Sequence, residues 1–112
     1  MSYKIYALNQ FKKDVKRLQK RYKYIKDDLK TLNKILQNNP KEGIRLFSNV
    51  YKIRVQNSSI NKGKSGGFRV IYYYIDKQKN IYLLSIYSKS DLANISDKKI
   101  LQILKNELFG EK

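Results

Sequence analysis

Apolar residues in the first third of the chain recur with the period of an α-helix. Beginning after Asn9, which can cap a helix, they form one face, and the same pattern returns between residues 25 and 36. Asn38, Asn39 and Pro40 then end the second segment, because the residue before proline is pushed away from helical geometry. The pattern predicts an antiparallel helical hairpin with two apolar stripes, Phe11, Val15, Leu18 and Tyr22, and Ile25, Leu29, Leu32, Ile35 and Leu36.

Alternation with a period of two predicts strands in the rest of the chain. Residues 2–7 and Val50–Gln56 alternate apolar and polar side chains, so each is expected to be a strand with one buried face. Phe68–Asp76 and Asn80–Ser88 are almost continuously apolar, which predicts a hairpin at the centre of the sheet. Lys41–Asn49 is expected to be a loop.

The C-terminal pattern completes the predicted fold. Ser96 and Asp97 form a helix start, apolar residues follow at helical spacing, and Gly110 stands at the expected end. The predicted order is β-α-α-β-β-β-α, an α+β domain with a mostly antiparallel sheet and the helical hairpin on one face. A chain of 112 residues holds one domain. The three tyrosines at 72–74 are expected to pack in the core, with at least one ring on each side, rather than to stack on bases.

Charge indicates what the chain binds. Lys and Arg number 25 against 9 Asp and Glu, a net charge of +16, and such an excess indicates a polyanionic partner, foremost a nucleic acid. Between Gly43 and Ile75 there is no acidic residue, so an anion near this stretch meets an unopposed positive field. The alternative is that the lysines only keep a small protein soluble.

Missing residue types exclude several kinds of site. Without His or Cys the chain cannot hold a Ser-His-Asp triad, a Cys-His pair or a disulfide. Scattered acids argue against a dedicated metal site, so we expect neither metal nor cofactor. The sequence has no apolar run of roughly 18 residues, the length that spans a bilayer, and no secretory signal. We therefore expect a cytoplasmic protein without membrane contact.

A basic, glycine-bearing loop precedes the first central strand. Lys62 and Lys64 lie in this segment, 61–67, whose glycines free the backbone and allow a ligand to approach closely. We expect both lysines to hold a nucleic-acid backbone rather than to do chemistry. Lys12 and Lys16 belong to the charged face of the first helix, which is either a solvated face or a surface that docks RNA or a protein partner.

Two stretches resemble a known family. Residues 64–73 (KSGGFRVIYY) and 82–91 (YLLSIYSKSD) look like the RelE/HigB toxins of the RelE/ParE superfamily, and above all like their HigB-like branch. The resemblance implies a single toxin domain over residues 1–112 with a microbial-ribonuclease-like fold, from a type II toxin–antitoxin pair. Most members cut messenger RNA in the ribosomal decoding site. The implied activity is therefore a metal-independent endoribonuclease that acts on mRNA on the ribosome and contacts ribosomal RNA.

The resemblance can be carried over residue by residue. The strand at residues 51–54 (YKIR) is similar to the family strand that presents two basic residues, here Lys52 and Arg54, to the substrate phosphate. Arg54 stands where Lys is common. Arg69 matches the most recognisable arginine of the family, and Lys89 matches the basic residue that closes the last strand.

The chemistry assigns roles to these residues. Cleavage of RNA by its own 2′-hydroxyl needs a proton acceptor, charge stabilisation at the phosphoryl oxygens, and a proton or charge for the leaving 5′-oxygen. Arg69 suits the phosphoryl oxygens, because its planar fork grips two of them. Lys52 is the candidate proton acceptor, since neighbouring cations disfavour the charged form of a lysine. Lys89, Tyr87 and Arg54 all remain open for the leaving-group side.

Two positions near the end of the motif qualify this assignment. Ile95 departs from the family pattern, because the ribosome-dependent members closest to the archetype carry Tyr near that position. Tyr87 can replace such a tyrosine only if its side chain faces the same cleft. Asp91 is the nearest carboxylate, and we expect it to orient Lys89 or to cap the turn after the strand rather than to act as a base.

Two other functions stay open from the sequence. One is a ParE-like DNA gyrase inhibitor, against which the presence of Lys52, Arg69 and Lys89 argues, and the other is a non-catalytic RNA-binding or vestigial toxin protein. An active nuclease of this kind would need a neutralising antitoxin. We expect an acidic protein that lays a helix or strand over the basic cleft in a toxin–antitoxin hetero-oligomer.

Overall fold

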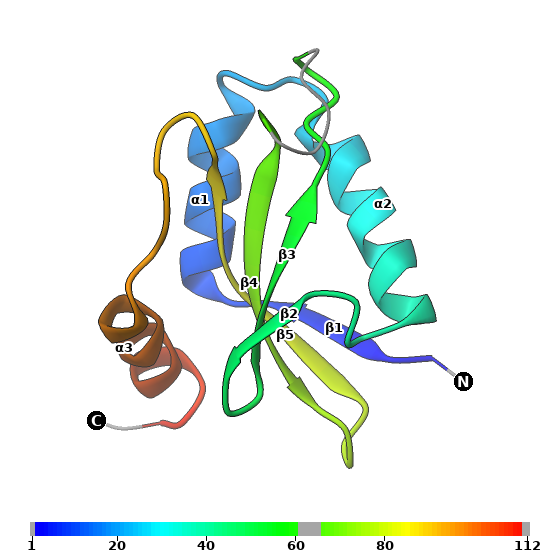
Figure 1. Ribbon diagram of the computed structural model, residues 1–112, viewed down its shortest axis with the longest axis vertical. Helices are drawn as coiled ribbons and strands as arrows, with labels where there is room; N and C mark the ends of the chain where they lie inside the picture. Colours follow the sequence, from blue (N-terminus) through cyan, green and yellow to red (C-terminus); the bar gives the residue numbers. More distant parts are fainter. Residues whose placement is uncertain (1, 61–65, 111–112) are drawn as a thin grey trace.

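A computed structural model describes residues 2–60 and 66–110. It contains one five-stranded sheet and three helices (Figure 1). The elements in chain order are β1 (Lys4–Ala7), α1 (Asn9–Gln19), α2 (Ile25–Asn38), β2 (Ile44–Phe47), β3 (Val50–Val55), β4 (Phe68–Ile75), β5 (Asn80–Ser88) and α3 (Asp97–Glu107).

The sheet has the strand order β1-β5-β4-β3-β2. β1 pairs with β5 in parallel, and every other pair is antiparallel, so the predicted α+β class and the central position of the β4–β5 hairpin are confirmed. The prediction of a loop over Lys41–Asn49 was wrong, because β2 lies inside it and pairs with β3. The four residues of β2 are too few to show a period-two pattern in the sequence. They form a strand because β3 lies beside them and supplies the hydrogen-bonding partner.

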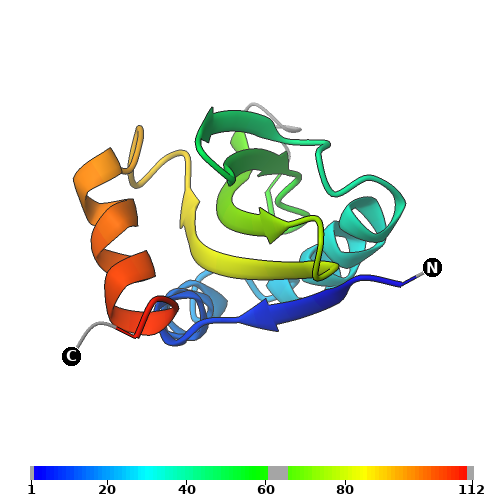
Figure 2. The ribbon, with the colours of Figure 1, turned by 90° about the horizontal axis from the view of Figure 1, so that it is seen from below.

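Two apolar clusters lie on opposite faces of the sheet. α1 and α2 cover one face and run in opposite directions, whereas α3 lies apart from them against the other face (Figures 1 and 2). Tyr72 and Tyr74 are buried on the side of α1 and α2, and Tyr73 packs on the side of α3. The tyrosine run therefore packs in the core on both sides, as predicted.

The start of α1 differs from the prediction. Leu8, not Asn9, is the N-cap residue, and no side chain of its own caps the helix. The carboxylate of Glu107, at the end of α3, instead accepts the backbone N–H groups of Asn9 and Gln10, the latter at 3.0 Å. These amides have no partner within the helix. A distant acid thus replaces the local cap and ties α3 to α1.

α1 also completes the edge of β5. β1 pairs with β5 only as far as Leu83, so the following residues of β5 lack a strand neighbour on that side. Asp14 fills the gap: its Oδ2 accepts from Ser85 Oγ at 2.7 Å and from the Ile86 N–H at 3.2 Å. This explains why an acid is 94% buried, with 6% of its surface exposed.

Close backbone approaches explain two of the glycines. A Cβ at Gly67 would lie 2.2 Å from the carbonyl oxygen of Val55, and one at Gly43 would lie 2.6 Å from that of Lys52. Gly67 therefore allows the chain to approach β3 closely just before β4 begins, a role that the sequence did not indicate. Across residues 2–60 and 66–110, none of the helices has the length and apolarity needed to cross a membrane.

Candidate active site

Strand register brings four of the predicted site residues together. Arg54 on β3 lies opposite Arg69 on β4, and Arg69 lies opposite Tyr87 on β5. Lys52 precedes Arg54 by two residues and so points to the same side of the sheet. This is the side away from α1 and α2, since the intervening Ile53 belongs to the apolar cluster beneath those helices. We call Lys52, Arg54, Arg69 and Tyr87 the sheet-face cluster.

Two guanidinium groups share the middle of this cluster. Arg69 is buried, with 6% of its surface exposed, whereas Arg54 is exposed. Burial lowers the pKa of Arg69, and the positive charge of Arg54 lowers it further. Directly opposed like charges in a sheet cost stability. A bound anion would offset both the burial of the Arg69 charge and its repulsion from Arg54. The arrangement therefore suits a phosphate group.

The hydroxyl of Tyr87 is bound by the segment that follows β5. It donates to Oδ1 of Asn94 at 3.4 Å and also has a hydrogen bond with the backbone of Ile95. Burial raises the pKa of Tyr87, and the charge of Arg69 opposes this rise. Tyr87 thus lies opposite Arg69 on the same side of the sheet, with its hydroxyl directed toward Asn94.

Lys52 reaches the same oxygen from the other side. Its Nζ donates to Asn94 Oδ1 at 3.5 Å. Asn94 therefore connects β3 with β5 across β4. It was not among the site residues predicted from the sequence. Its signal is weak, because an asparagine in the connection between a strand and a helix is an ordinary loop residue.

A pocket of about 440 Å³ adjoins this cluster at the edge of β3. It lies between the end of α2 and the start of β2, and both Lys52 and Arg54 contribute to its wall. The other lining residues are Ile35, Asn38, Asn39, Glu42, Gly43, Ile44 and Ile53.

Lys89 and Asp91 are placed differently from the expectation. Lys89 is exposed directly after β5, where its backbone N–H donates to the carbonyl oxygen of Gly67 at 3.0 Å. No contact joins its amine to the sheet-face cluster among the described residues. The carboxylate of Asp91 does not orient Lys89 but binds Arg21. The distances from Arg21 Nη1 to Asp91 Oδ1 and Oδ2 are 2.7 and 2.6 Å. This pair ties the end of β5 to the connection between α1 and α2.

Two of the four predicted nucleic-acid contacts, Lys12 and Lys16, lie away from the sheet-face cluster. Lys12 and Lys16 are exposed on α1, which packs against the opposite face of the sheet. If they bind RNA, they do so from a second surface. Lys62 and Lys64 lie outside the described residues.

Solved structures share this fold. A double-mutant form of the E. coli toxin RelE in the free state has a TM-score of 0.59 and 17% identity, over 95% of this chain and 98% of that chain. A chain of the intact E. coli RelBE toxin–antitoxin complex has a TM-score of 0.56 and 19% identity, over 76% of this chain and 94% of that chain. The mutant RelE bound to an antitoxin RelB peptide has a TM-score of 0.57 and 17% identity, over 91% of this chain and 93% of that chain.

The sequence carries the family assignment, since structural likeness at such identity shows the fold alone. A family profile described as the RelE toxin of the RelE/RelB toxin–antitoxin system matches residues 4–108, which is nearly the whole chain. The chain belongs to the RelE toxin family, the toxin half of a type II toxin–antitoxin system.

Proposed function

We propose that this toxin is an endoribonuclease that cleaves messenger RNA on the ribosome and so inhibits translation. The observation that carries the proposal is the register of Arg54 against a 94% buried Arg69, whose exposed fraction is 6%. Two opposed cations, one of them buried, lower stability and would be offset by a phosphate between them. Unfavourable electrostatics of this kind are a mark of functional sites.

Arg69 is assigned to the phosphoryl oxygens and Arg54 to the charge that develops beside them. The guanidinium of Arg69 is buried, and its Nη1 donates to the carbonyl oxygen of Phe68 at 3.4 Å. Little reorganisation is then needed when a phosphate binds. Burial lowers the pKa of Arg69, but arginine side chains stay protonated in proteins at neutral pH. The charge is therefore present when the transition state forms.

Lys52 is assigned to the 2′-hydroxyl proton and Lys89 to the leaving 5′-oxygen. Lys52 lies on the same face as both arginines and is half-buried. Tyr87 is the alternative for the leaving group, and its hydroxyl would have to turn away from Asn94 Oδ1, to which it donates at 3.4 Å. Lys89 is exposed at the end of the neighbouring strand and can move toward a bound nucleotide.

The need for the ribosome follows from the weakness of this acid–base set. No histidine is present, and lysine and arginine are poor proton-transfer groups at neutral pH. Much of the rate must then come from a substrate already held in line for attack, which can supply up to about 7–11 kcal/mol. A ribosome that fixes the messenger would provide this.

A cognate antitoxin is the second partner that we propose. RelE of E. coli has been solved with its antitoxin RelB, and this toxin carries a net charge of +16. An acidic segment laid over the sheet-face cluster would neutralise the two arginines and block the phosphate site. The product is a hetero-oligomer that forms and dissociates with the level of antitoxin.

The test is cleavage of a defined messenger on purified ribosomes, mapped by primer extension. Arg69→Ala should lower the cleavage rate by about 10²- to 10³-fold, the usual loss when a charge-stabilising donor is removed. The cleavage rate of Arg69→Lys should lie between those of wild type and Arg69→Ala, because lysine keeps the charge but lacks the planar, two-pronged guanidinium.

Arg45→Ala is the matched control, because it removes the same charge from an exposed side chain of β2 that lies opposite Tyr51 and outside the sheet-face cluster. Equal cleavage by wild type and Arg69→Ala, with both proteins folded, would refute the assignment. Inhibition of DNA supercoiling without RNA cleavage would favour the gyrase alternative. Cleavage of free RNA at the same rate would remove the ribosome requirement.

A further inference from the structure

We propose that Asn94 is a positioning residue of this site, which holds Lys52 in place through a shared hydrogen-bond acceptor. The proposal rests on the function proposed above and adds a residue to which neither the sequence nor the family profile assigns a role. Its basis is one oxygen atom, Asn94 Oδ1, which accepts from Lys52 Nζ at 3.5 Å and from Tyr87 OH at 3.4 Å.

The two donors come from strands that do not touch. Lys52 is on β3 and Tyr87 on β5, with β4 between them. Neighbouring strands lie about 4.8 Å apart, so the two backbones are separated by roughly 10 Å. Asn94 therefore bridges the cluster over the strand that carries Arg69. Its oxygen fixes the end of a flexible lysine relative to the buried arginine.

The segment that carries Asn94 is itself anchored at both ends. On one side Asp91 binds Arg21 at 2.6 Å. On the other side Ser96 caps α3 by accepting the N–H of Lys99 at 3.1 Å. Asn94 lies between these anchors, and although its side chain is exposed, they limit how far the segment that carries it can move.

An amide suits this position better than a carboxylate. A neutral acceptor orients the lysine amine but leaves the positive charge of the site intact for the phosphate. A carboxylate at the same place would favour the protonated lysine and repel the substrate. Of the charged residues that the structure describes, Arg54 and Arg69 share the face of Lys52, and Glu42 lines the adjoining pocket.

The first experiment measures ribosome-dependent cleavage as a function of pH. Asn94→Ala should lower kcat by up to about 10²-fold with little change in KM, because the amine is no longer held in line. Asn94→Asp keeps the acceptor and should recover activity only at higher pH, with the acidic limb of the pH–rate profile moved up by about one unit or more. Leu92→Ala changes a 44% exposed side chain of the same segment and should leave kcat and the profile unchanged.

A second readout needs no catalysis. In NMR spectra of the free toxin, Asn94→Ala should shift the ε-methylene signal of Lys52 and the ring signals of Tyr87, whereas Leu92→Ala should not. If wild type does not cleave messenger RNA, the proposed function fails. The spectra then still show whether Asn94 holds the side chains of Lys52 and Tyr87 in place. Unshifted signals, or an Asn94→Ala enzyme with wild-type kcat and an Asn94→Asp profile that does not move, would overturn the positioning role.

Discussion

The hydroxyl of Tyr72 closes the connection between α2 and β2. It donates to the carbonyl oxygen of Pro40 at 2.7 Å and accepts the N–H of Gly43 at 3.1 Å. The side chain is fully buried, and burial raises the pKa of Tyr72 to about 12. Like Asp14 beneath β5, this single polar group satisfies backbone atoms that secondary structure leaves without a partner.

The raised pKa of Tyr72 makes stability depend on alkaline pH. A pKa that is higher in the folded than in the unfolded state, where tyrosine titrates near about 10, gives stability that is complete below pH about 10 and lost toward pH 12. Tyr72→Phe should cost about 1–2 kcal/mol at pH 8 through lost hydrogen bonds. The difference from wild type should shrink by about 1 kcal/mol at pH 11.

Urea unfolding at the two pH values measures this difference. Tyr24→Phe is the control, because Tyr24 is 45% exposed. A gap between wild type and Tyr72→Phe that stays constant with pH would contradict the prediction.

At the scale of elements, α3 depends on contacts made at its two ends. Its start is capped by Ser96, and its last residue, Glu107, caps α1. Between them, three buried residues of α3 pack on the sheet. α3 also follows the segment that carries Asn94, so its attachment bears on the site as well as on stability.

Removal of the Glu107 carboxylate should loosen both helices together. Glu107→Ala leaves two amides of α1 uncapped and should lower the free energy of unfolding by about 1–2 kcal/mol, the upper range for a cap with helix-dipole support. Hydrogen exchange should accelerate at Asn9, at Gln10 and along α3. Asn106→Ala, an exposed change in the same turn, should leave exchange at α1 unaffected; acceleration confined to α3 would show that the cap is not shared.

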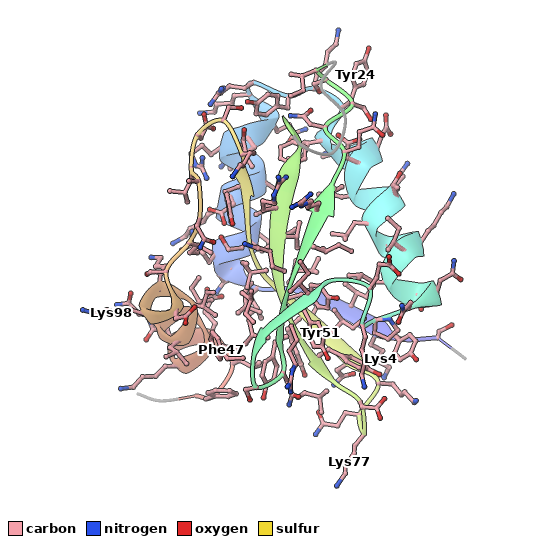
Figure 3. The ribbon with its side chains drawn as sticks, viewed as in Figure 1. Lys4, Tyr24, Phe47, Tyr51, Lys77 and Lys98 are labelled. Carbon is pink, nitrogen blue, oxygen red and sulfur yellow. The ribbon has the colours of Figure 1, made fainter. Side chains whose placement is uncertain are left out.

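At the scale of the whole molecule, positive charge is spread over several surfaces. The sheet-face cluster lies on one side of the sheet, and the lysines of α1 lie on the other. Lys77 and Lys98 point outward at two further places on the rim (Figure 3). One RNA strand in the cleft cannot contact all of these, so a large RNA such as the ribosome would use more than one.

Salt dependence separates these surfaces. Each lysine that neutralises a phosphate contributes to the slope of log affinity against log salt, by about 0.9 on the scale measured for duplex DNA. Replacement of Lys12 and Lys16 by Ala should therefore reduce the slope of ribosome binding by about 1.8 without a change in kcat. Replacement of Lys77 and Lys98 by Ala removes the same charge. Equal losses from the two pairs would indicate a diffuse field rather than a docking surface on α1.

The sequence by itself determined the elements whose signals are local. Helical spacing gave the hairpin of α1 and α2, and Pro40 gave its end, since α2 stops at Asn38. Period-two alternation placed Lys52 and Arg54 on one face of β3, and the absence of acids nearby indicated an anion site. Such patterns depend only on neighbours along the chain, so a single sequence is enough to find them.

The tertiary structure alone decided the contacts between distant segments. Only the strand register places Arg54 opposite Arg69. Only the path of the chain after β5 brings Asn94 within reach of Lys52 and Asp91 within reach of Arg21. The same holds for β2, which has no period of its own, and for the cap on α1. Apart from the short β2–β3 pairing, these partners are distant in sequence, from 15 residues for Arg54 and Arg69 to 98 for Asn9 and Glu107. Their free energy of contact depends on where the whole sheet places them, which no local spacing encodes.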